Sequence, residues 1–219
     1  MNLTESMVFV FKNKSQNIFK GFVKEDLKII LNTLIEDFSS IGISSKNFFK
    51  SIPQNGIKSS IRQFAKSSKE TGQVFIVIPK RVVSGFKIFK QDFLAELEAL
   101  PDQKQKSIFC LKVIGSLCSF LVMNFTTLKK SGAKTSLPSL IKTQVVVRLS
   151  QVLVLRVLGE VAQNMSDEED LKHLNYFRSL LQHPEKSNIA DLSTDGGDEA
   201  IQIVEKLKNY IFTLPDNGS

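Results

Sequence analysis

The chain has 219 residues, of which 42 % are hydrophobic and 23 % charged, enough to bury a core in one domain or two small ones. Only eleven glycines, six prolines and two cysteines occur, which excludes a collagen-like chain and a disulfide-built scaffold. The net charge of +7 is uneven, because residues 44–90 hold ten basic residues and one acidic one, whereas residues 161–219 hold eleven acidic and five basic ones.

Residues 1–100 are predicted to form basic, phenylalanine-rich amphipathic helices. Apolar residues recur every three or four positions between Leu27 and Phe38, and residues 48–64 suggest two short helices broken at Pro53. The clearest helix is expected to begin at Pro79 and to stop at Pro101. Residues 73–78 are the best strand candidate, but a single strand cannot form a sheet, so a helical turn or extended chain is expected there.

Residues 104–163 are predicted to be a pair of long apolar helices. The first, at 107–128, carries a single charge, Lys112, and a stripe of small and polar residues on one side, including Gly115 and Ser119. Such a stripe lets another helix approach closely. The second, at 140–162, is rich in β-branched residues, but its length and its interrupting charges favour one helix over strands.

Residues 166–213 are predicted to form acidic C-terminal helices. Ser166 is expected to cap the first of them, with three acidic residues in the first turn and Glu169 at the capping-box position. The last helix is expected at about 198–213. The predicted fold is therefore all-α: a single-domain bundle of about eight helices, residues 1–219, around two long apolar central helices.

The segment 107–128 is also long enough to cross a bilayer. Its helical neighbour, however, holds Arg148 and Arg156, and each arginine at a bilayer centre costs about 2.5–3.5 kcal/mol. A buried bundle core is thus favoured over a single span or a transmembrane hairpin. The first residues lack the pattern of a signal peptide, so a cytoplasmic location is expected, including a peripheral position at the inner face of a membrane.

No catalytic constellation is found, so an enzyme is not expected, and neither a cofactor nor a metal site is predicted. The two histidines, His173 and His183, lie in no metal-binding spacing. Residues 191–196 resemble the start of a calcium loop, but Gln202 stands where a bidentate carboxylate is required. The cysteines, Cys110 and Cys118, are interpreted as buried apolar residues.

The basic stretch interleaves lysines with phenylalanines, a pattern typical of helices that lie on anionic membranes. Nucleic acid is an unlikely partner, because lysine does not read bases in the bidentate way that arginine does. The candidate membrane or lipid surface consists of Lys46, Phe48, Phe49, Lys50, Lys58, Arg62, Lys66, Lys80, Arg81, Lys87 and Lys90.

The predicted function is non-enzymatic: binding of a lipid or another hydrophobic ligand, or peripheral association with anionic membranes. The alternative is a helical module that binds a protein partner and whose apolar centre is purely structural. The side chains expected to line either an apolar ligand site or the core are Phe86, Phe89, Phe93, Leu117, Phe120, Leu121, Val154 and Leu158.

Overall fold

The computed structural model describes residues 1–26, 30, 69–131, 137–184 and 198–213. These residues contain helices and no strand, which confirms the all-α class. They form six continuous helical segments rather than about eight. The first segment consists of α1 (Leu3–Phe9), the π-helical turn η1 (Val10–Lys14), α2 (Ser15–Gly21) and the π-helical turn η2 (Phe22–Asp26). The others are α6 (Lys69–Ala99), α7 (Gln103–Ser131), α8 (Leu137–Gln163), α9 (Glu168–Gln182) and α10 (Asp198–Phe212).

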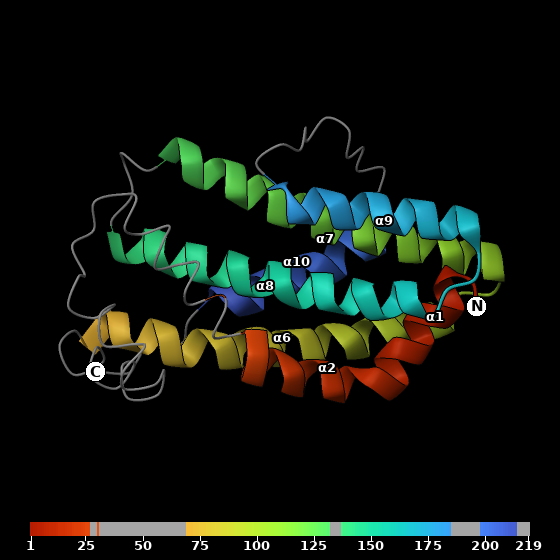
Figure 1. Ribbon diagram of the computed structural model, residues 1–219, viewed down its shortest axis with the longest axis horizontal. Helices are drawn as coiled ribbons and strands as arrows, with labels where there is room; N and C mark the ends of the chain where they lie inside the picture. Colours follow the sequence, from red (N-terminus) through yellow and green to blue (C-terminus); the bar gives the residue numbers. More distant parts are fainter. Residues whose placement is uncertain (27–29, 31–68, 132–136, 185–197, 214–219) are drawn as a thin grey trace.

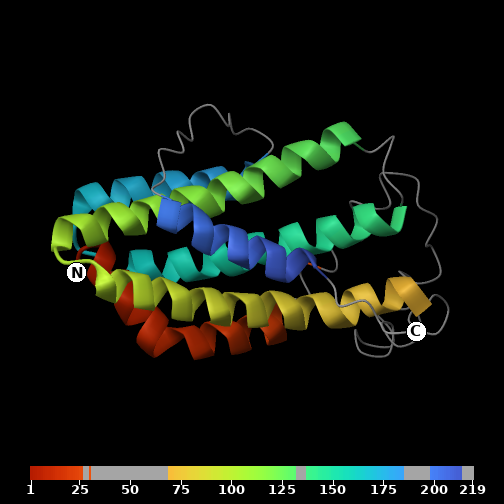
Figure 2. The ribbon, with the colours of Figure 1, turned by 180° about the vertical axis from the view of Figure 1, so that it is seen from behind.

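The helices are stacked along one long axis (Figure 1). α8 lies between the α7–α9 pair and the layer formed by α6 and α2, and it contacts all of the other described helices. From behind, α10 crosses obliquely between α6 and α7, in front of α8 (Figure 2). The chain's first residues lie beside the turn that joins α6 to α7, so α1 packs against both α7 and α8.

The first helical segment is held at its start by backbone and side-chain hydrogen bonds. Asn2 Oδ1 accepts from the Glu5 N–H at 2.9 Å, while the Asn2 N–H donates to Glu5 Oε2 at 3.1 Å, which completes a capping box. Leu3 N donates to Asp170 of α9 at 2.9 Å, and the buried Ser6 hydroxyl donates to the Val161 carbonyl of α8 at 2.7 Å. These bonds tie α1 to α8 and α9.

The π-helical turn η1 widens this segment where it meets α6. Side chains engage two carbonyl groups at the turn: Asn13 Nδ2 donates to the Phe9 carbonyl at 3.1 Å, and the Ser15 hydroxyl donates to the Phe11 carbonyl at 2.7 Å. Lys90 of α6 donates to the same Ser15 hydroxyl at 3.0 Å. Single π-turns within α-helices occur frequently at functional sites.

The prediction that a helix begins at Pro79 is wrong, because α6 begins ten residues earlier, at Lys69, with Pro79 inside it. Proline lacks an N–H and therefore removes one hydrogen bond from a helix interior. Here Ile78, just before the proline, and Val82, three residues after it, are fully buried. Their packing against the core stabilises the helical conformation on both sides of Pro79. The strand candidate at 73–78 is accordingly helical.

Phenylalanine rings from η1, α6 and α7 pack together in the core. This phenylalanine cluster consists of Phe11, Phe86, Phe89, Phe93 and Phe109. Phe93 is fully buried, and its ring centroid lies 5.1 Å from that of Phe11 and 5.7 Å from that of Phe109. Phe89 stacks on Phe93 at 6.3 Å, and Phe86 meets Phe89 edge-on at 5.9 Å. Aromatic pairs at these separations stabilise a core beyond the apolar area that they bury.

The small-residue stripe predicted on α7 lies against α9 at Gly115. A Cβ at Gly115 would lie 3.8 Å from the Phe177 ring, which is ordinary van der Waals contact. The segment 140–162 is helical as predicted and lies within α8. Its Arg156 passes over Gly21 of α2 and pairs with Asp26 of η2 at 2.8 Å, so this arginine joins two helical segments.

The predicted cap of α9 is displaced by one residue. Asp167, not Ser166, is the N-cap, and its carboxylate accepts from the backbone N–H groups of Glu169 and Asp170. Ser166 lies outside the helix, and its hydroxyl accepts from the Met1 ammonium at 2.6 Å instead of from the backbone of α9. The acidic first turn is present as expected.

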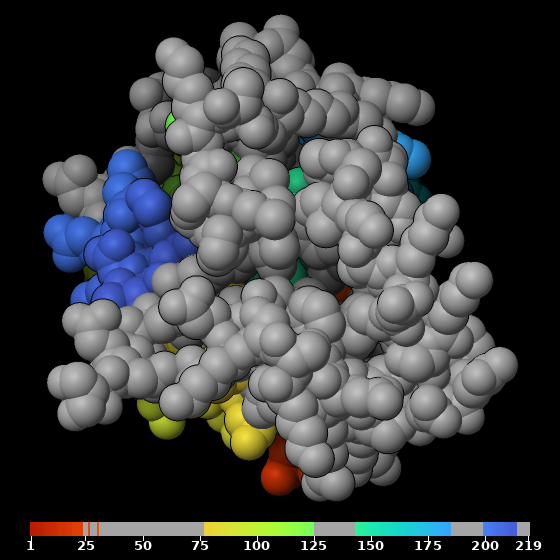
Figure 3. Space-filling model, turned by 90° about the vertical axis from the view of Figure 1, so that its left-hand side faces the viewer, coloured from red at the N-terminus to blue at the C-terminus, as the bar shows by residue number. Residues whose placement is uncertain are grey.

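α10 spans Asp198–Phe212, close to the predicted range, and lies at the surface beside α6 (Figure 3). The two helices approach at Gly85, where a Cβ would lie 2.7 Å from Ile211 and 3.0 Å from Tyr210. Arg81 donates to the Tyr210 carbonyl and sits 4.6 Å from the centre of its ring. It thereby satisfies a carbonyl at the helix C-terminus, where a cation is also favourable.

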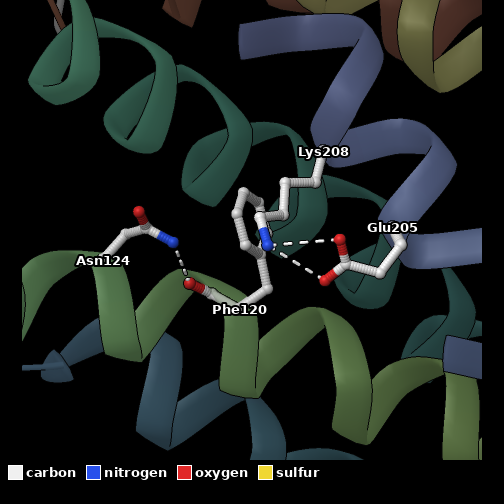
Figure 4. Close-up of polar contacts among 4 residues, drawn as sticks. All are labelled: Phe120, Asn124, Glu205 and Lys208. Carbon is white, nitrogen blue, oxygen red and sulfur yellow. Dashed lines mark hydrogen bonds and ion pairs between the residues drawn. The ribbon is translucent and has the colours of Figure 1, made fainter.

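α10 contacts α7, and an aromatic pair lies between the two helices. Lys208 donates to both oxygens of Glu205 at 3.0 and 3.2 Å, and Asn124 donates to the Phe120 carbonyl at 2.7 Å, so both polar contacts stay within one helix (Figure 4). The contact between the two helices includes the edge-on pair of Phe120 and Phe212 at 5.8 Å.

Candidate functional site

A groove opens where α1 and η1 meet the end of α6 and the start of α7. Its volume is about 490 Å³, within the range of small-molecule sites. It lies next to the turn between α6 and α7, because its lining includes Leu97 and Glu98 before that turn and Gln103 and Lys106 after it. Its lining consists of Thr4, Glu5, Val8, Phe9, Lys12, Asn13, Leu94, Leu97, Glu98, Gln103 and Lys106.

The apolar lining is contributed by two helices that are distant in sequence. α1 provides Val8 and Phe9, and α6 provides Leu94 and Leu97. Leu97 is buried, whereas the other three are half-buried and keep apolar surface toward the groove. Half-buried side chains in a concave site can lose water to a ligand, which favours the binding of hydrophobic groups.

Charged side chains complete the groove. Lys12 of η1 pairs with Glu98 of α6 at 2.9 Å and so joins the two helices across it. The hydrogen bond and the charge of Lys12, together with the charge of Lys106, hold the pKa of the Glu98 carboxyl below its usual value. This carboxylate is therefore ionised at neutral pH. Both partners are largely exposed, so solvent screens the pair.

The apolar residues predicted to line a ligand site or the core are part of the packed interior. Phe86, Phe89 and Phe93 are buried in the phenylalanine cluster, and Phe120 is half-buried against α10. The remaining four are also buried, and none of the eight lines the groove: Leu117, Leu121, Val154 and Leu158.

The predicted basic surface is only partly described. Lys80 and Lys87 are exposed on α6, whereas Arg81 and Lys90 are engaged with Tyr210 and Ser15. The others lie outside the described residues: Lys46, Phe48, Phe49, Lys50, Lys58, Arg62 and Lys66. The expected helices at 27–38 and 48–64 fall largely or wholly outside as well, as does the calcium-loop resemblance at 191–196.

Among the described residues, one helical stretch, Gln103–Asn124, is long and apolar enough to cross a membrane, and half of its most apolar window is buried in the bundle. The core helix of a soluble protein can have the same composition, so this stretch alone does not indicate a span.

The cysteines are buried and unpaired with each other. Burial raises the pKa of the Cys110 thiol to about 12 and raises the pKa of Cys118 further. Both thiols are therefore protonated at neutral pH, which makes them poor nucleophiles. In the part of the chain that the structure describes, no group of three or more metal-ligating residues comes together.

Comparison with protein-family models, curated proteins and solved structures finds no match to this chain. The groove was not predicted from sequence, because its lining comes from three separate segments and Val8, Phe9 and Lys12 belong to no recognisable motif. The signal present in the sequence is the mixture of polar and apolar residues at the start of the chain, which is typical of an amphipathic helix. Such a pattern does not show which other helices pack beside that helix.

Proposed function

We propose that this protein is a non-enzymatic binder of a hydrophobic small molecule, which it holds in the groove between α1, η1, α6 and α7. The carrying observation is the groove itself: about 490 Å³, with apolar side chains from two helices beside a charged cluster. α7 and α8 serve as the apolar centre of the bundle in this proposal, since α8 contacts all of the other described helices.

The packed core argues for the groove as the ligand site rather than the space between α6, α7 and α8. In the phenylalanine cluster, the centroids of neighbouring rings are 5.1–6.3 Å apart, the separation of packed aromatic pairs. A ligand inserted there would have to displace side chains that bury their full area. A ligand in the groove displaces only water.

Peripheral association with anionic membranes stays a prediction, because most of the basic segment lies outside the described residues. The exposed Lys80 and Lys87 are compatible with it. Binding of a protein partner is the alternative function. We propose a cytoplasmic location for the protein under either of these functions.

The proposal predicts that decanol, a neutral amphiphile, binds the full-length protein and that Leu94→Gln weakens this binding about tenfold, which corresponds to about 1.4 kcal/mol. Leu94 is half-buried and lines the groove, so the change places an amide where hydrocarbon should pack. Isothermal calorimetry measures both affinities.

The matched control is Leu155→Gln, which alters another half-buried leucine, on α8 and outside the groove. This variant should bind decanol like the unmodified protein. Absence of any saturable decanol heat, or equal losses in both variants, would overturn the proposed function.

A further inference from the structure

Three charged side chains of the groove lining form a cluster of two lysines and one carboxylate: Lys12, Lys106 and Glu98. Glu98 is paired with Lys12 at 2.9 Å, and Lys106 lies near enough for its charge to act on the same carboxylate. Within the described residues, no hydrogen bond or ion pair engages the Lys106 ammonium. Glu98 is therefore paired with one of the two lysines in the groove lining, and the other, Lys106, has no paired carboxylate among the described residues.

The fourth charged residue in the lining, Glu5, is already committed. Its carboxylate accepts the Asn2 N–H at 3.1 Å in the capping box and lies at the positive end of α1. Without Glu5, the charged lining holds two lysines and one carboxylate, so a ligand carboxylate beside the apolar side chains of the groove would balance its charge.

We infer that the ligand of the groove is a single-chain amphiphile with one carboxylate, a free fatty acid by chemical class. Its chain packs on the apolar lining, and its carboxylate binds Lys106 while it competes with Glu98 for Lys12. Glu98 is then an internal competitor that keeps Lys12 occupied in the empty groove. This inference rests on the proposed function, since it names the ligand of the same site.

The test compares decanoate with decanol, which share a chain length and differ in charge. Isothermal calorimetry on the full-length protein should show decanoate binding about fivefold more tightly. Lys106→Met, which keeps most of the apolar stem, should remove this preference, so that decanoate and decanol bind this variant with equal affinity. Glu98→Gln should instead tighten decanoate binding by about twofold to fivefold, because the competing carboxylate is gone.

Lys87→Met is the control, since Lys87 is exposed on α6 outside the groove. It should leave both affinities unchanged, and thermal melts should show that all the variants fold. Equal affinity for decanoate and decanol, or a preference that survives Lys106→Met, would overturn the inference while leaving the proposed function intact. Failure of both ligands to bind would overturn the proposed function as well.

Discussion

Replacing Phe93 with alanine should lower the free energy of unfolding by about 3–5 kcal/mol, as expected for the removal of a fully buried ring. Phe93 has no exposed surface and lies within 5.1–6.3 Å of three other phenylalanine rings. Its loss removes ring contacts to η1 and α7 and leaves a cavity that the surrounding helices cannot fully close. Urea denaturation followed by circular dichroism measures the change.

The milder variant Phe93→Leu, which keeps most of the apolar volume, should cost about 1–1.5 kcal/mol and is available should the alanine variant not fold. Phe120→Ala serves as the comparison, because that ring is half-buried and should cost less. Decanol affinity should not change in Phe93→Leu. A stability loss near zero together with weakened ligand binding would show that Phe93 lines a ligand site instead of the core.

The second large effect is expected at Gly85, where α6 crosses α10. Gly85→Ala would place a methyl group 2.7 Å from Ile211, which is itself fully buried, and 3.0 Å from Tyr210. Overpacking of this kind costs about 1–3 kcal/mol, and alanine returns up to about 1 kcal/mol through its better helix propensity. The variant should therefore be less stable by about 1–2 kcal/mol in chemical denaturation.

Gly115→Ala is the matched control, because it makes the same change inside a helix but at a position where the added methyl lies 3.8 Å from the Phe177 ring. The propensity gain should dominate there and raise the free energy of unfolding by about 0.5–1 kcal/mol. If α6 and α10 cross as closely as described, the free energy of unfolding should fall in Gly85→Ala and rise in Gly115→Ala. A stabilising effect of Gly85→Ala would show that the helices are farther apart than described.

The sequence predicts the long helices well because their apolar periodicity extends over many turns. Residues 137–163 and 198–212 are helical close to where the pattern places them, and Val82, Phe86, Phe89, Phe93 and Leu97 are all buried on one side of α6. Local signals are overridden where tertiary contacts compete with them. Buried side chains on both sides of Pro79 keep α6 continuous, and the Ser166 hydroxyl accepts from Met1 while Asp167 caps α9.

The candidate site is harder to predict than the fold, since a groove depends on which helices lie side by side. Arg81 shows the same limit for a single residue. In the sequence it belongs to a basic run and is expected at a membrane surface, yet in the structure it binds the Tyr210 carbonyl at the end of a helix more than a hundred residues away. Charge pattern alone does not distinguish a solvated cation from a helix cap.

The central claim is that hydrophobic ligands bind in the groove and not among the packed helices. Methyl-resolved NMR of protein labelled at leucine and valine, titrated with decanol, tests it most directly. Saturable shifts are predicted for Val8, Leu94 and Leu97, which line the groove. Shifts centred instead on Leu117, Leu121, Val154 and Leu158, which are buried in the core, would contradict the account.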